Sequence, residues 1–315
     1  MAAAWAGCSE RTPVSDSSRT GAEGGARERD PRAVRRRDLL RAVGGVGVST
    51  PLTGCLDDGG GDPDPGLPES ASSCSRDRAD DAALPFDSGE EYGGWGGHTH
   101  HGTAAGLSHR PIVFVHGNGR DACDFDGHAG YFVERGYSGD ALWAITFGRE
   151  TSTHAEMREQ LDSFVERVRR YTDTERVDLV GHSLGVTGIR YWLAEDDRYE
   201  WVDSMVGLAG ANHGTWTCGP GCVAGPGSAR ICDFLSHACA DTPGRPLYEL
   251  NADETPGPTE YYTIRGTDDD FFRTRPTSPE LDGAENVVLD GADHDAVGTS
   301  DTTRELLFGW LSDGQ

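Results

Sequence analysis

Short apolar runs recur along the chain after about residue 105, separated by polar stretches. Six of these runs hold four to seven residues and are rich in Val, Ile, Leu and aromatic side chains, which is typical of buried strands: residues 111–115, 141–147, 177–180, 204–208, 261–264 and 285–289. Helical patterns are expected at residues 131–137, 153–168, 186–193 and 302–311. This alternation predicts an α/β fold, with a mostly parallel sheet and helices on both faces.

The clearest helix precedes the run at residues 177–180. Thr153 is followed three positions later by Glu156, the spacing of a capping box. Its core-facing stripe repeats at helical spacing and consists of Met157, Leu161, Phe164, Val165 and Val168. We therefore expect this helix to deliver the chain into a central strand.

The run at residues 177–180 leads into Gly181-His182-Ser183-Leu184-Gly185, a G-x-S-x-G pattern. Such a serine lies on a strained strand-to-helix turn, where only small residues fit two positions to either side. The chain has 44 glycines, so the pattern alone could arise by chance. The strand before it and the helix after it favour Ser183 as a nucleophile.

Three further predicted strands end in turns that carry polar residues. The run at residues 111–115 leads into His116-Gly117-Asn118-Gly119, and the run at residues 285–289 is followed by His294. Between them in chain order, three consecutive acids follow the run at residues 261–264: Asp268, Asp269 and Asp270. The order Ser, Asp, His along the chain is that of α/β-hydrolases. Because parallel strands end at one edge of a sheet, we expect these groups to meet there, with His294 as the base.

Other residues near these turns have simpler interpretations. His116 and His182 are expected to fix loops by hydrogen bonds. His213 is an alternative base because it also follows a strand, but it precedes every candidate acid. The remaining acids, including Asp121 and Asp293, are expected to be solvated surface charge.

The charge balance narrows the classes of partner. The chain has 53 acidic and 28 basic residues, a net charge of -25, and no lysine. This excess of acid argues against binding nucleic acid through its phosphates. It resembles the composition of proteins from extremely salt-loving organisms, in which molar salt shortens the Debye length to about 3 Å and screens self-repulsion. We expect a halophilic protein that loses structure at low salt, with circular dichroism as the test.

Residues 1–54 are interpreted as a leader. Arg35-Arg36-Arg37 precedes a mildly apolar stretch, which resembles a twin-arginine signal too short to span a membrane. Leu52-Thr53-Gly54-Cys55 resembles a lipobox. We expect export by the twin-arginine machinery and a membrane tether through lipidated Cys55 on the extracellular face, or secretion without the lipid. Residues 55–106 are rich in Gly, Asp, Pro and Ser and are expected to form a flexible acidic tether.

The histidine cluster and the cysteines are possible metal ligands, but both have simpler interpretations. His98-Thr99-His100-His101 lies in the predicted tether without Cys or Asp at ligand spacing, so it is interpreted as polar filler. Apart from Cys8 and Cys55, six cysteines remain, an even number that favours disulfides in an exported protein: Cys74, Cys123, Cys218, Cys222, Cys232 and Cys239. Four lie in a Gly- and Pro-rich insertion at residues 215–250, which leaves Cys74 with Cys123. The alternative is a zinc site that includes Cys218-x-x-x-Cys222.

From about residue 110 to residue 311 the chain resembles secreted lipases of the α/β-hydrolase superfamily. It is similar to class 2 lipases and, at residues 113–121 and 208–218, to lipase-like extracellular polyhydroxybutyrate depolymerases. The resemblance implies an α/β-hydrolase domain at residues 107–315, with a Cys-rich, lid-like insertion at about residues 215–250. It favours Asp269 as the triad acid, three residues after Gly266, with Asp268 and Asp270 left open. It also implies an oxyanion hole formed by the backbone N–H groups of Asn118 and Leu184.

Together these features predict an exported serine hydrolase, a lipase or carboxylesterase that acts on ester or lipid substrates and needs no cofactor or metal. A polyhydroxyalkanoate depolymerase is the alternative within the class. An acyltransferase and a non-catalytic, ligand-binding surface lipoprotein are the others. A fluorophosphonate probe would label every member of this set except the last.

Overall fold

The computed structural model describes residues 77–221 and 230–312. The predicted export signal, Cys55, Cys74 and Cys222 lie outside these ranges. Within the described residues, no helix combines the length and the apolar character that crossing a membrane requires.

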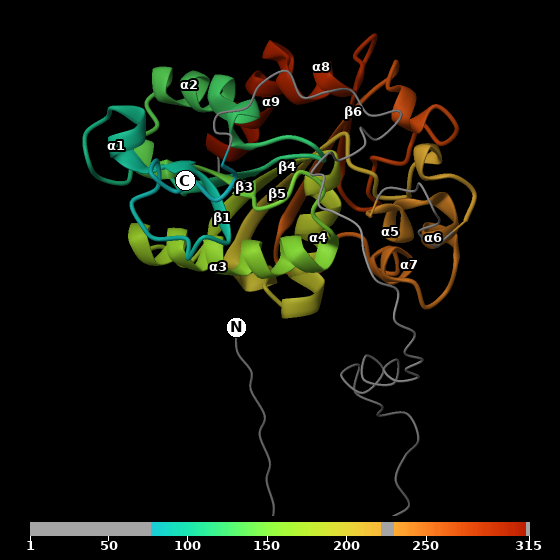
Figure 1. Cartoon of the computed structure of the whole chain (residues 1–315). Coiled ribbons are helices and arrows are strands. Elements are labelled where there is room, and N and C mark those ends of the chain that lie inside the picture. The colour runs from blue at the N-terminus through green and yellow to red at the C-terminus, as the bar shows by residue number, and fades with distance from the viewer. Residues whose placement is uncertain (1–76, 222–229, 313–315) are drawn as a thin grey trace, which may run out of the picture. The chain divides into compact units, whose positions relative to one another are not determined.

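The core is a seven-stranded sheet within the described residues, in the order β1-β3-β2-β4-β5-β6-β7 (Figure 1). Strands β2 to β7 all run parallel to one another, and the edge strand β1 pairs antiparallel with β3. The strands are β1 (Tyr92–Gly96), β2 (Ile112–Val115), β3 (Leu142–Phe147), β4 (Val177–His182), β5 (Val202–Leu208), β6 (Glu260–Gly266) and β7 (Glu285–Leu289). All six strands expected from the apolar runs are present, so the mostly parallel sheet is confirmed.

Strand β1 corrects the expected extent of the tether. Residues 92–96 were expected to lie in a flexible linker, but they pair with β3 from Tyr92 opposite Phe147 to Gly96 opposite Trp143. Tyr92 is fully buried and Trp95 is 3% exposed. The glycines between these rings allow a close fit, since a Cβ on Gly94 would lie 2.1 Å from the carbonyl oxygen of Ala144. Burial of these two aromatic rings therefore stabilises a strand in spite of the high glycine content. The folded domain thus begins before residue 107.

The histidines of the predicted tether are part of this fold. They belong to α1 (Gly97–His101), which follows β1 directly. His98 Nδ1 lies 2.9 Å from Asp140 Oδ1, and His101 Nε2 lies 3.3 Å from the carbonyl oxygen of Leu142. These contacts hold α1 against the start of β3, so the interpretation as linker filler is wrong for both residues.

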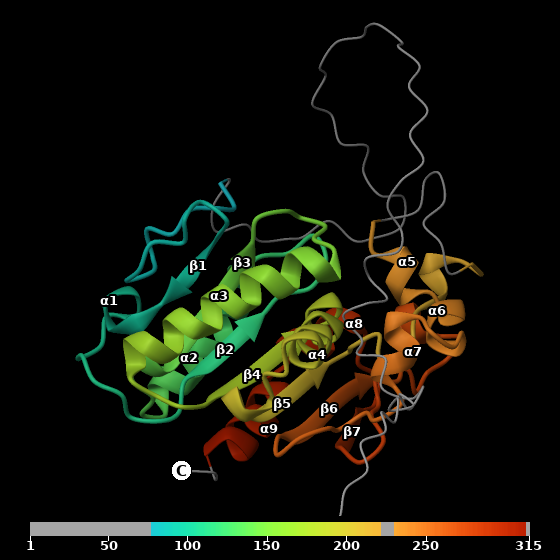
Figure 2. The same ribbon diagram turned by 90° about the horizontal axis from the view of Figure 1, so that it is seen from below.

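Helices cover both faces of the sheet, as predicted. Figures 1 and 2 show α3 and α4 on one face and α2 and α9 on the other. The helices of the described residues that follow α1 are α2 (Asp126–Glu134), α3 (His154–Thr172), α4 (Leu184–Asp196), α5 (Cys232–Leu235), α6 (His237–Asp241), α7 (Pro246–Leu250), α8 (His294–Thr299) and α9 (Asp301–Ser312).

Helix α3 follows its sequence pattern closely. Thr153 caps it through the backbone N–H of Glu156, and the Glu156 carboxylate accepts in return from the Thr153 N–H, which is the predicted capping box. All five residues of the predicted stripe are buried, together with His154. Burial of this stripe against the sheet fixes α3 beside α4.

The insertion between β5 and β6 forms a separate group of helices, α5 to α7. Cys218 is disulfide-bonded to Cys232. Cys123 is also part of a disulfide, and so is Cys239. The disulfide interpretation is therefore confirmed at these four cysteines, and Cys218 cannot serve as a zinc thiolate. The insertion also packs on α3, where the Phe234 ring stacks on His154 with 3.5 Å between ring centroids.

Candidate active site

Ser183 occupies a strained turn between β4 and α4. Its backbone has φ 53° and ψ -120°, a conformation that residues with a Cβ rarely adopt. Two residues later the chain passes very close to β2, where a Cβ on Gly185 would lie 2.4 Å from the carbonyl oxygen of Val115. The G-x-S-x-G pattern therefore forms the tight strand-to-helix turn that it predicts, with Ser183 at the N-terminus of α4.

Asp269, which is buried, and His294, which is partly buried, form a pair after the ends of two neighbouring strands. Nδ1–H of His294 donates to Oδ2 of Asp269 over 2.7 Å, and the side chains are 11% and 2% exposed, respectively. The other Asp269 oxygen accepts from the backbone N–H of Phe271 at 2.9 Å. The ring of Phe271 packs against His294 with 4.4 Å between centroids. Both the position and the tautomer of the imidazole are thereby defined, with Nε2 directed away from Asp269.

The two acids beside Asp269 have different surroundings. Asp268 is exposed, and its carboxylate accepts from the Thr267 hydroxyl at 3.2 Å. Asp270 is also exposed, and its carbonyl oxygen accepts from the indole N–H of Trp216 at 2.6 Å. Of the three candidate acids, Asp269 is the one whose carboxylate contacts His294.

His182 connects the nucleophile turn to the helix that carries His294. Its Nε2–H donates to the carbonyl oxygen of His294 over 3.2 Å, and the two ring centroids are 4.9 Å apart. Burial, together with neighbouring His294, keeps the pKa of His182 well below its usual value. His182 is therefore neutral and holds a loop, as expected, and it joins the strand that ends before Ser183 to the helix that begins with His294.

The turn after β2 lies directly against Ser183. A Cβ built on Gly117 would lie 3.0 Å from the Cβ of Ser183. Asn118 is the next residue of this turn, and Leu184 is the first residue of α4. The first N–H groups of a helix have no acceptor within the helix. The two N–H groups predicted for the oxyanion hole thus belong to the turn of Ser183 and to the neighbouring turn after β2.

His116 stabilises the turn after β2. Its Nε2 accepts from the backbone N–H of Phe147 at 3.0 Å, so the ring proton is on Nδ1, which donates to the carbonyl oxygen of Gly117 over 2.7 Å. Burial and the nearby Arg78 guanidinium lower the pKa of His116 to about 3. His116 is therefore neutral and structural, as expected.

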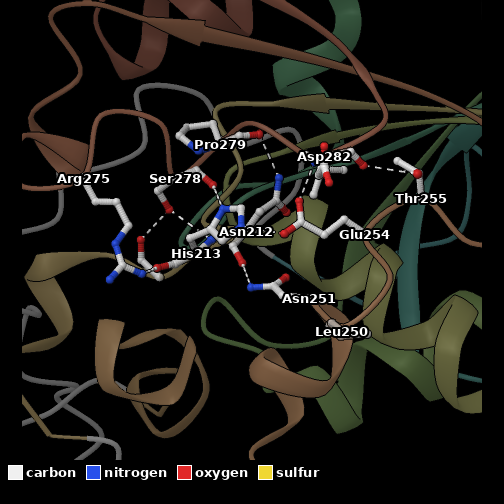
Figure 3. A network of polar contacts seen from close by, with 12 residues as sticks. Asn212, His213, Leu250, Asn251, Glu254, Thr255, Arg275, Ser278, Pro279 and Asp282 are labelled. Atoms are coloured by element: carbon white, nitrogen blue, oxygen red, sulfur yellow. Dashed lines mark hydrogen bonds and ion pairs between the residues drawn. The ribbon is translucent and has the colours of Figure 1, made fainter. Parts of the chain in front are cut away.

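His213 belongs to a separate polar network after β5 (Figure 3). Its Nδ1 lies 3.1 Å from the carbonyl oxygen of Ser278, and its Nε2 lies 2.8 Å from Glu254 Oε1. Both ring nitrogens are thus engaged by protein oxygen atoms. Neither nitrogen is left to exchange a proton with a serine, so His213 is not suited to be the base.

Two residues that the sequence did not single out flank the turn after β2. Arg78 donates to the carbonyl oxygens of Phe147 and Arg120, and it also contacts the His116 ring. Arg120 forms ion pairs with Asp124 and Asp295. An arginine in a polar stretch carries no recognisable pattern, so no sequence signal marks either one. Asp121, expected to be solvated, is instead 4% exposed and accepts from the backbone N–H of Cys123 at 3.0 Å.

The site has the elements of nucleophilic acyl chemistry. It combines a serine on a strained turn, a nearby imidazole whose Nδ1 is held by a buried carboxylate, and backbone N–H groups beside the serine. These elements come from the ends of β2, β4, β6 and β7, which meet at the carboxyl edge of the sheet.

Comparisons with known proteins place this arrangement in context. Residues 109–305 match the family model of lipase (class 2). The mature form of Bacillus licheniformis lipase BlEst2 superposes with a TM-score of 0.53, at 16% identity over 64% of this chain and 92% of that chain. Its propeptide form gives a TM-score of 0.51 at 17% identity, over 64% of this chain and 50% of that one. At these identities the likeness shows a shared α/β-hydrolase fold.

Proposed function

Because the chain belongs to the class 2 lipase family, we propose that it is an exported serine hydrolase, which cleaves carboxylic esters through an acyl-enzyme at Ser183. The family and fold make it an ester hydrolase of the lipase and esterase kind. The proposal adds the identity of the nucleophile, the residues that assist it and the place where the enzyme works.

In this mechanism Nε2 of His294 accepts the hydroxyl proton as Ser183 attacks the ester carbonyl. A tetrahedral oxyanion forms, and the N–H groups of Asn118 and Leu184 donate to it. His294 then transfers the proton to the leaving alcohol, which leaves an acyl-serine. Water repeats the sequence, releases the carboxylic acid and returns the proton to Ser183. Asp269 keeps the imidazole in the required tautomer and stabilises its charged form.

The observation that carries this proposal is the partly buried hydrogen bond between Asp269 and His294, near a serine with positive φ. Strained backbone at a non-glycine residue costs on the order of 1–3 kcal/mol and is found most often at functional sites. The hydrogen bond from His182 to His294 links the two features. The combination of a strained serine with an oriented imidazole is what nucleophilic catalysis by serine requires.

The test is hydrolysis of a p-nitrophenyl ester by the native chain and by Ser183→Ala in high salt. We expect loss of kcat by about 10⁵-fold or more in the variant, with its circular dichroism spectrum unchanged. A fluorophosphonate probe should label the native chain and fail to label Ser183→Ala. A native chain that is folded yet neither hydrolyses esters nor reacts with the probe would instead support the ligand-binding lipoprotein.

Export and lipidation rest on the sequence resemblance at Arg35-Arg36-Arg37 and Cys55. We expect the full chain to fractionate with membranes and Cys55→Ser to be released in soluble form, with esterase activity unchanged. Retention of Cys55→Ser on membranes would exclude the lipid tether.

A further inference from the structure

We propose that Arg78 is a positioning residue for this reaction: it clamps both ends of the oxyanion turn, His116 to Arg120, against the end of β3. The proposal rests on the proposed function above, because it assigns to that turn the N–H of Asn118. Arg78 lies in the stretch that the sequence predicted to be a tether, well outside the part of the chain that matches the family model, residues 109–305. Arg78 would therefore act on the turn from outside the matched region.

Three acceptors surround the Arg78 guanidinium, and each belongs to the framework of the turn. Nε donates to the carbonyl oxygen of Phe147 over 2.7 Å, and Nη2 donates to the carbonyl oxygen of Arg120 over 2.6 Å. Nη2 also lies 3.3 Å from Nε2 of His116. Phe147 is the last residue of β3, while His116 and Arg120 bracket the turn. One planar cation thus fixes the entry and exit of the turn relative to a rigid strand.

Neighbouring carboxylates help to keep the Arg78 guanidinium charged. Burial lowers the pKa of Arg78, and the carboxylates of Asp121 and Glu150 oppose this shift. The guanidinium stays protonated, because its pKa normally exceeds 12. A lysine could not reproduce these contacts, since an ammonium group lacks the planar fork that reaches separate acceptors.

The clamp also extends toward the proposed base. Arg120, whose carbonyl oxygen Arg78 binds, forms ion pairs with Asp124, at 3.1 Å, and with Asp295, which directly follows His294. Cys123, three residues beyond Arg120, is disulfide-bonded. A displacement of the turn would therefore disturb the Asn118 N–H and the helix that carries His294 together. A shift of about 1 Å in such a group can cost about 100-fold in rate.

The decisive experiment compares the native full chain with Arg78→Ala and Arg78→Lys in ester hydrolysis. We expect kcat to fall by about 10- to 100-fold in both variants, while KM changes by less than about threefold, because an oxyanion donor acts in the transition state. An alkyl trifluoromethyl ketone, which adds to Ser183 to form an oxyanion, supplies the second readout. Its inhibition constant should rise by the factor by which kcat/KM falls.

The inhibition constant separates positioning from a loss of folded protein. A smaller folded fraction lowers the apparent kcat but leaves the inhibition constant of the molecules that remain folded unchanged. Ethylguanidinium should restore part of the activity of Arg78→Ala by occupying the vacated space. Arg170→Ala is the matched control, because Arg170 is 75% exposed and pairs with Glu166 on α3. This control should keep native kinetics and show no rescue.

Native kcat in Arg78→Ala would overturn the proposal, as would a reduced kcat with an unchanged inhibition constant. If Arg78→Ala does not fold, the same two results in Arg78→Lys would overturn the proposal. Failure of the proposed function looks different, because the native chain would then be no more active than Ser183→Ala.

Discussion

The molecule contains two histidine–carboxylate pairs that look alike in distance and differ in chemistry. His294 with Asp269 and His213 with Glu254 are joined over 2.7 and 2.8 Å, respectively, and each histidine follows a strand of the sheet. At His213 the second ring nitrogen is used by the carbonyl oxygen of Ser278. At His294, Nε2 makes no hydrogen bond within the described part of the chain, and the ring lies beside the turn of Ser183.

A carboxylate next to an imidazole therefore does not by itself define a catalytic pair. What matters is the other ring nitrogen. Where it is free it can exchange a proton with a nucleophile, and where it faces a second acceptor the histidine joins loops together. The His213 network does this for the segments after β5, after α7 and before β7 (Figure 3).

The largest expected difference between the two pairs is in kcat after each imidazole is removed. We expect His294→Ala to lower kcat by about 10⁵-fold and Asp269→Asn by about 10⁴-fold, since the first removes the base and the second the partner that orients it. His213→Ala should keep kcat within about threefold, because none of its partners takes part in the proposed reaction. Steady-state kinetics on one ester measure all three. An inactive His213→Ala that is folded would reverse the assignment.

His182 offers a smaller effect that sharpens the difference. In His182→Leu the carbonyl oxygen of His294 loses its donor, so we expect kcat to fall about tenfold and stability by about 1–3 kcal/mol. His128→Leu is the matched control, because both nitrogens of this buried ring have no hydrogen-bond partner among the described residues. That control should retain native kcat and lose no stability. Equal losses in the two variants would show that only packing is involved.

The smallest expected effect is on the pH dependence of stability, to which Glu254 of the structural pair should contribute. Burial alone would raise its pKa, but hydrogen bonds from His213 and the Asp282 N–H outweigh burial and leave the pKa below its usual value. A carboxyl with a lowered folded-state pKa adds stability above its unfolded pKa, and this stability is lost as pH falls. The free energy of unfolding of the native chain should thus exceed that of Glu254→Gln by about 1–3 kcal/mol at pH 7. This gap should narrow below about pH 4.5.

Urea unfolding of the native chain and Glu254→Gln at several pH values measures this gap. The kcat of Glu254→Gln should stay near that of the native chain throughout. A gap that is constant from neutral to acidic pH would show that the charge of Glu254 contributes nothing to stability.

The alternating layers, the six parallel strands and the tight turn at Ser183 could all be predicted from the amino-acid sequence. Each depends on local patterns: the length of an apolar run, the repeat of a helical stripe, the capping box at Thr153, and glycine where the backbone has no room. Such patterns are set within a dozen residues, so neighbouring side chains suffice to read them.

Contacts between residues far apart in the sequence became visible in the folded chain. The tertiary structure selects Asp269 from three adjacent acids as the contact of His294, joins Cys218 to Cys232, and engages both nitrogens of His213. It also makes a strand of the glycine-rich segment at Tyr92–Gly96 and brings Arg78 to the turn after β2. The physical reason is that these contacts depend on strand register and on packing between segments far apart in sequence, which no local pattern encodes.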